Sequence, residues 1–101
     1  MTNFVGTWNA TIDTPIRRMA VVFNITEEKG VFSGTSNNEE ESVDMVNFCA
    51  DGDVLTWTQE VSKPMKLTLK FNVTFDGDEM AGTAKAGIFP ASKLRGSRAT
   101  A

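Results

Sequence analysis

The segment Met65–Phe75, MKLTLKFNVTF, alternates apolar and polar residues along its whole length. Successive side chains of a strand point to opposite faces, so this pattern predicts a strand with one buried and one solvated face. The same period of two continues through most of the chain, and turn signals such as Asp51-Gly52-Asp53 and Asp76-Gly77-Asp78 interrupt it at short intervals. Helical periodicity is absent. The sequence therefore predicts an all-β protein.

About eight antiparallel strands are expected within a single domain of 101 residues. Their expected bounds are Asn3–Asp13, Arg17–Thr26, Val31–Ser36, Val43–Cys49, Val54–Val61, Met65–Phe75, Glu79–Ala86 and Ser92–Ala99. A sandwich and a closed barrel both fit strands with one apolar face. Short connections between all sequential strands favour an up-and-down barrel, because sandwiches usually need longer crossovers.

Four glycines lie inside predicted strands, in the pieces FVGTW, FSGT, MAGT and LRGSR. In each piece an apolar residue two positions earlier marks the inward face, so Gly6, Gly34, Gly82 and Gly96 should point inward as well. An inward glycine allows a strand to bend, and it also removes side-chain volume from the interior. A barrel of this size is either just filled by side chains or holds one small ligand. The sequence is therefore compatible with both a packed interior and a cavity.

The motif Gly6-Thr7-Trp8 on the first strand, together with Arg98 on the last, resembles the calycin superfamily of lipocalins, fatty-acid-binding proteins and avidins. The resemblance implies a barrel in which Arg98 lies across Trp8 and seals one end. A guanidinium can stack on an indole while its N–H groups bind free carbonyl groups. The chain is much shorter than a lipocalin and lacks the late Trp-Leu-Leu run of avidins, so biotin binding is not implied.

Composition excludes several classes of chemistry. The chain has no histidine or tyrosine and a single cysteine, Cys49, which excludes a Ser-His-Asp triad, a Cys-His dyad and metal or haem sites built on imidazole. No phosphate-binding glycine loop is present, and we expect no cofactor and no metal. The net charge of −3 argues against nucleic acid as a partner. With neither a signal peptide nor an apolar run of membrane-spanning length, no membrane partner and a cytoplasmic location are expected.

Two polar residues could face the interior. Gln59 shares a face with Leu55 and Trp57, and a polar group among apolar ones needs a partner or a ligand. The direction of Asp44 is ambiguous, because Val43 and Met45 cannot face the same way as Val46 and Phe48 in a regular strand. If Val46 and Phe48 faced inward, a buried Asp44 could serve as a general acid or base.

The expected function is non-catalytic binding of a small apolar or amphipathic molecule inside the barrel. One alternative is an enzyme of the cyclase or isomerase type, in which Asp44 or Glu60 moves a proton. Another is a structural or oligomerisation module with a fully packed core, and a homodimer is compatible with each. The candidate ligand-binding residues are Trp8, Met19, Phe23, Trp57, Gln59, Met65, Leu67 and Arg98.

Overall fold

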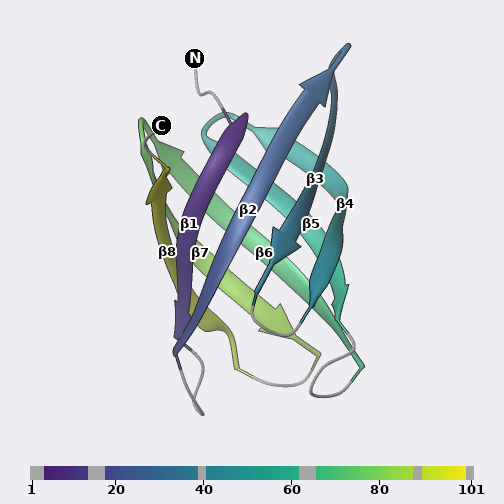
Figure 1. The fold of residues 1–101 in the computed structure, drawn as a ribbon, viewed down its shortest axis with the longest axis vertical. Helices are drawn as coiled ribbons and strands as arrows, with labels where there is room; N and C mark the ends of the chain where they lie inside the picture. Colours follow the sequence, from purple (N-terminus) through teal and green to yellow (C-terminus); the bar gives the residue numbers. More distant parts are fainter. Residues whose placement is uncertain (1–3, 14–17, 39–40, 62–65, 88–89, 100–101) are drawn as a thin grey trace.

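Eight antiparallel strands close into one barrel in the computed structural model, which describes residues 4–13, 18–38, 41–61, 66–87 and 90–99 (Figure 1). The strands are β1 Gly6–Asp13, β2 Arg18–Glu28, β3 Val31–Asn37, β4 Ser42–Asp51, β5 Val54–Val61, β6 Leu67–Asp76, β7 Glu79–Ala86 and β8 Ser92–Arg98. The all-β expectation is confirmed. The bounds of β5 and β7 are as predicted, whereas β1 begins at Gly6 and Phe4 precedes it outside the strand.

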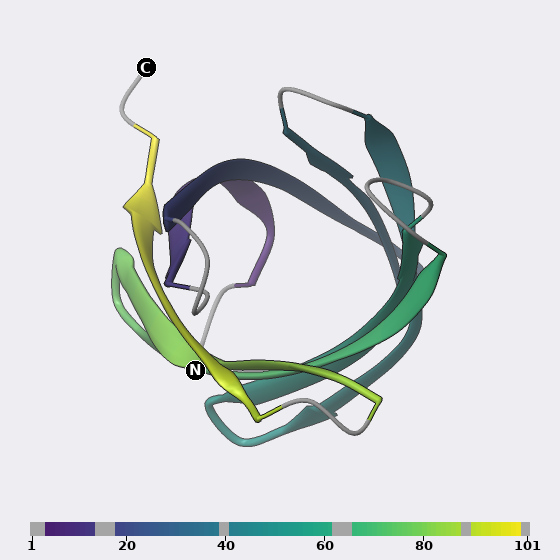
Figure 2. The ribbon, with the colours of Figure 1, turned by 90° about the horizontal axis from the view of Figure 1, so that it is seen from below.

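The strand order is up-and-down, with each strand beside its neighbours in sequence. β1 closes the ring by pairing with β8, which places Trp8 opposite Arg98 and Asp13 opposite Lys93. Viewed from below, the strands follow one another around a ring (Figure 2). A closed barrel, and not a sandwich, is therefore the correct alternative.

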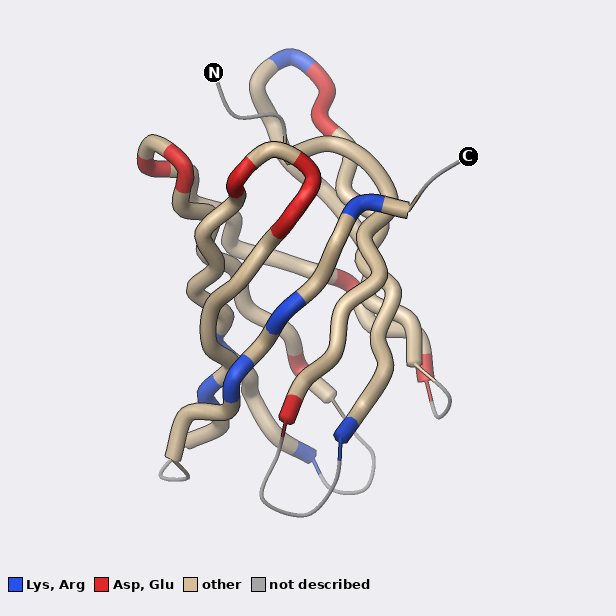
Figure 3. Tube along the Cα trace, turned by 90° about the vertical axis from the view of Figure 1, so that its left-hand side faces the viewer, with Lys and Arg blue, Asp and Glu red and all other residues tan. Residues whose placement is uncertain are grey.

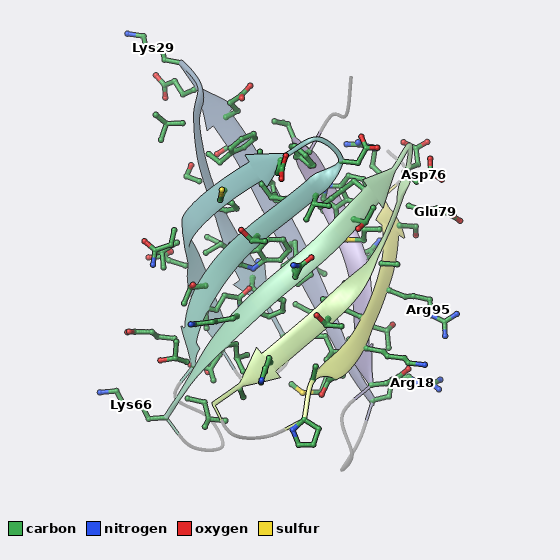
Figure 4. All side chains as sticks on the ribbon, turned by 180° about the vertical axis from the view of Figure 1, so that it is seen from behind. Arg18, Lys29, Lys66, Asp76, Glu79 and Arg95 are labelled. Carbon is green, nitrogen blue, oxygen red and sulfur yellow. The ribbon has the colours of Figure 1, made fainter. Side chains whose placement is uncertain are left out.

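The two ends of the barrel differ in their connections. We call the upper end the one with the turns between β2 and β3, β4 and β5, and β6 and β7; β8 also ends there (Figure 1). At the lower end β1 is followed by β2, β3 by β4, β5 by β6 and β7 by β8. The upper turns are acidic, and several Lys and Arg residues lie nearer the lower end (Figure 3). Figure 4 shows this polarity with Asp76 and Glu79 above Lys66 and Arg18.

Aromatic rings form a continuous chain of contacts through the interior. Each ring meets the next with centroids between 4.9 and 6.2 Å apart, mostly edge to face. Edge-to-face pairs add roughly 0.5–1.5 kcal/mol each beyond the area they bury. The chain runs through Trp8, Phe75, Phe4, Phe32, Phe48, Trp57, Phe71 and Phe23.

A bulge in β4 resolves the ambiguity about its direction. Val46 pairs with Thr58 and Cys49 with Thr56, so two residues of β4 oppose one residue of β5. Asn47 has a φ of 57°, which turns the chain within the bulge. Met45 and Phe48 consequently both contribute to the core, while Asp44 stays exposed. Odd-numbered residues such as Met45 therefore face the interior before the bulge, and the even-numbered Phe48 does so after it. A regular strand cannot make this change.

At two of the inward glycines, backbone atoms of a neighbouring strand occupy the space that a side chain would need. A Cβ on Gly82 would collide with the carbonyl oxygen of Asn72 and approach the Cα of Val73 to 2.7 Å. A Cβ on Gly96 would lie 2.7 Å from the carbonyl oxygen of Asn9. Neighbouring strands thus approach these positions closely as the sheet coils. Gly82 and Gly96 therefore serve bending and close strand approach, and they do not leave empty space in the interior.

Replacing Gly82 by alanine should lower the free energy of unfolding by about 2 kcal/mol or more, because the clash is with rigid backbone. The matched control is Ala81→Ser on the exposed face of the same strand, with an expected change below about 0.5 kcal/mol. Urea unfolding of both variants measures the difference. Equal stabilities would show that the sheet relaxes at Gly82 and that close approach is not required.

Candidate functional site

Trp8 and Arg98 make contact at the upper end of the barrel. The guanidinium carbon of Arg98 lies 4.2 Å from the centroid of the Trp8 ring, and Trp8 is fully buried. Arg98 Nη1 donates a hydrogen bond of 2.5 Å to the carbonyl oxygen of Val5, and Trp8 Nε1 donates one of 3.0 Å to that of Phe4. These bonds hold the segment before β1 at the end of the barrel, with Phe4 packed edge-on against Phe75.

Gly6 provides the space that Arg98 occupies. A Cβ at this position would collide with Nη1 of Arg98, and the φ of 139° is one that other residues rarely adopt. The spacing of Gly6 and Trp8 thus has two consequences, a gap for the guanidinium and an aromatic face beneath it. The contact that the sequence motif implied between Trp8 and Arg98 is present.

Asp78 adds an outer partner to Arg98, since Arg98 Nε donates to a carboxylate oxygen of Asp78 at 2.9 Å. The Asp78 side chain is 82% exposed, so water screens this pair. The less exposed contacts of Arg98 with Val5 and Trp8 should therefore contribute more to stability than the ion pair does.

The middle of the interior holds three of the candidate residues. Trp57 stacks on Phe71 with ring centroids 5.0 Å apart, and Phe23 meets Trp57 edge-on at 5.3 Å. Trp57 Nε1 donates a 2.9 Å hydrogen bond to Oε1 of Gln59, which is 3% exposed. The polar group that the sequence places among apolar residues thus has a partner within its own strand. Phe23, Trp57 and Gln59 together form one buried layer.

Below this layer the inward faces carry half-buried apolar side chains. Leu67 and Leu69 share the face of buried Phe71, and Met19 shares that of buried Val21. Further half-buried inward residues at this end are Val43, Val61 and Ala86. Met65, also a candidate, lies outside the described residues. The structure therefore brings Met19 and Leu67 to the lower end, whereas Trp8 and Arg98 lie at the opposite end.

Reactive groups are on the outer surface. Asp44 and Glu60, the carboxylates considered for proton transfer, are both exposed, and so is Cys49. Within the part of the chain that the structure describes, no cluster of three acidic or cysteine side chains could hold a metal ion. The chemistry available inside the described barrel is thus apolar contact, the Gln59 amide and the hydroxyl group of buried Ser36.

Leu69 and Phe4 are not among the candidate ligand-binding residues, although both pack in the core region. Leu69 follows Leu67 on the inward face of β6, so the alternation of that segment already contained it. Phe4 is the apolar residue of FVGTW that marks the inward face, and it is part of the core although it precedes β1, with its carbonyl group accepting the hydrogen bond from Trp8.

No protein family, curated protein or solved structure matches this chain. Among the described residues, no helix has the length and apolar character needed to cross a membrane.

Replacing Arg98 by alanine should lower the free energy of unfolding by about 2 kcal/mol, since the Val5 carbonyl and the Trp8 ring both lose their partner. Arg18→Ala is the matched control, because Arg18 also pairs with an aspartate, Asp13, at 2.9 Å but is 77% exposed. We expect a change below about 0.5 kcal/mol there. Thermal unfolding of both variants tests this, and equal losses would mean that the ion pair is the main contribution of Arg98.

Proposed function

We propose that the barrel binds a small apolar or amphipathic molecule at the lower end of its interior. The observation that carries the proposal is the difference in burial between the two ends. Most inward apolar side chains at the upper end and in the middle are buried, with Phe32 and Phe48 as half-buried exceptions. At the lower end Ile12 is buried, but Met19, Val61, Leu67 and Leu69 are only half-buried. Apolar side chains that converge inside one end of a barrel are typical of a site for a small ligand.

The buried layer above this region would form the floor of the site. Phe23, Trp57 and Phe71 present aromatic rings there, and Gln59 lies among them. Covering the half-exposed side chains with an apolar ligand contributes roughly 25 cal/mol per Å² removed from water. Trp8 and Arg98 would not touch such a ligand, because they lie at the far end.

A calycin-like architecture belongs to the same proposal. Supporting it are the closed eight-stranded barrel, the strand order and the arrangement of Gly6, Trp8 and Arg98. This arrangement is more specific than the barrel alone, since it requires a gap, an indole and a guanidinium from both ends of the chain at one place.

The second candidate is a structural module whose barrel only packs. The tight upper and middle layers favour it, because Trp8, Phe23 and Leu55 have no accessible surface. The two candidates differ in what the lower end does. The enzyme alternative lacks this kind of support, since Asp44 and Glu60 face solvent.

Titration with a bromoalkanol should quench tryptophan fluorescence saturably, because bromine quenches an indole that it contacts and Trp57 lies at the floor. Ala86 faces Leu69 across β6 and β7, so Ala86→Phe should fill the site and weaken binding about tenfold, roughly 1.4 kcal/mol. Ala81→Phe places the same side chain on the exposed face of β7 and should bind as the parent does.

Trp57→Phe leaves Trp8 as the reporter and should abolish most of the quenching. If the parent protein shows no saturable quenching, or if Ala86→Phe and Ala81→Phe bind equally, the barrel interior is not the site and the packing module is the better description.

A further inference from the structure

One junction of the barrel is incomplete. β3 and β4 pair only between Gly34–Asn37 and Ser42–Met45, at the lower end. Above that point β4 bends away from β3 and crosses toward β5 (Figure 1). Within the described residues, Val31–Ser33 of β3 and Val46–Asp51 of β4 have no strand partner on the sides that face each other. We call this opening the β3–β4 split.

The bulge at Asn47 is the cause of the split. An extra residue bends a strand and increases its twist, and here the bend begins where the pairing with β3 stops. Unpaired strand edges are the places where a sheet accepts another strand. The free edge of β4, Val46–Asp51, extends about 20 Å, which is enough to pair with a short extended peptide.

Apolar side chains surround the same opening. Val31 is 68% exposed and Val46 is 42% exposed, and these are the large apolar side chains that the described residues leave most open to solvent. They flank the split on its outer side, one from each strand. Phe32 and Phe48 lie beneath, half buried, with ring centroids 6.0 Å apart. A free backbone edge and uncovered apolar surface thus coincide at one place.

Exposed acidic residues surround the β3–β4 split, and they favour a partner of positive charge. Glu27 and Glu28 lie directly beside β3, opposite Phe32 and Val31 in the register, and are exposed. Asp44 and Asp51 are exposed along β4.

Lys29 at the tip of the β2–β3 turn is the exception, and it projects beyond the barrel (Figure 4). A second copy entering through the same edge would bring like charges together, whereas a segment rich in Lys and Arg would meet opposite charge.

We propose that the β3–β4 split binds an extended basic segment of a partner protein, which adds to the free edge of β4 as a strand. Alternate apolar side chains of the segment cover Phe32 and Phe48. The Lys or Arg residues between them point outward, where their aliphatic stems lie over Val31 and Val46 and their charges meet the acidic rim. This site is separate from the proposed ligand site at the lower end and does not depend on it.

The test uses a labelled eight-residue peptide of alternating valine and lysine, acetylated and amidated, in a fluorescence anisotropy titration. We expect saturable binding that weakens with salt, and at least tenfold weaker binding of the matching valine–glutamate peptide. Hydrogen exchange should show new protection of the amides in Val46–Asp51. Equal binding of both peptides, or protection elsewhere in the barrel, would overturn the proposal.

Val46→Lys should weaken binding of the valine–lysine peptide at least tenfold, since it replaces an exposed apolar side chain by one with the same charge as the peptide. Thr74→Lys adds the same charge at an exposed position of β6, away from the split, and should bind within twofold of the parent protein. Equal affinities of the two variants contradict the proposal.

Two further measurements distinguish peptide binding at the split from ligand binding at the lower end and from self-association. Ala86→Phe, which fills the lower end, should bind the peptide normally, so failure of the ligand proposal and failure of this one remain distinguishable. Sedimentation of the protein alone should show a monomer. A dimer that Val46→Lys dissociates would mean that a second copy occupies the split, and the basic-peptide proposal would then be wrong.

Discussion

Pairing between the first and last strands is the constraint on which the rest of this barrel depends. It joins residues from opposite ends of the chain, as the hydrogen bond from Arg98 to Val5 shows with its separation of 93 positions. Such a contact closes a loop of almost the whole chain, and distant segments lose entropy when they meet. Trp8 and Arg98 secure this junction with a buried contact, and closure leaves neither β1 nor β8 as a free edge.

The glycines show how so small a ring accommodates its contents. At Gly82 and Gly96 the space for a side chain is taken by the backbone of the next strand, and at Gly6 it is taken by the guanidinium of Arg98. Large aromatic rings fill the interior beside these positions, and Trp8, Phe23 and Phe75 are almost completely buried. Half-buried inward apolar side chains remain at the lower end, at Met19, Leu67 and Leu69, and beside the β3–β4 split, at Phe32 and Phe48.

The bulge at Asn47 is the cause both of the β3–β4 split and of the aromatic packing beneath it. The bulge at Asn47 lets both Met45 and Phe48 reach the interior, which completes the chain of aromatic contacts from Phe32 to Trp57. The same bend carries β4 away from β3 and leaves two backbone edges without partners. Natural sheets usually protect such edges with charge, and the acidic residues along this opening fit that role while also defining which partner could enter.

The sequence by itself determined the class of fold, because period-two alternation and short turns leave few arrangements other than an antiparallel meander. It also indicated the inward direction of Trp8, Trp57 and Gln59, since alternation assigns each residue to a face. It could not decide the direction of Asp44, which depends on the bulge in β4, or choose between a filled and an open interior, which depends on how closely the backbones of paired strands approach. Only the tertiary structure placed Trp8 and Arg98 at one end and Met19 and Leu67 at the other, since position along the barrel follows from register and closure, which a pattern of faces does not contain.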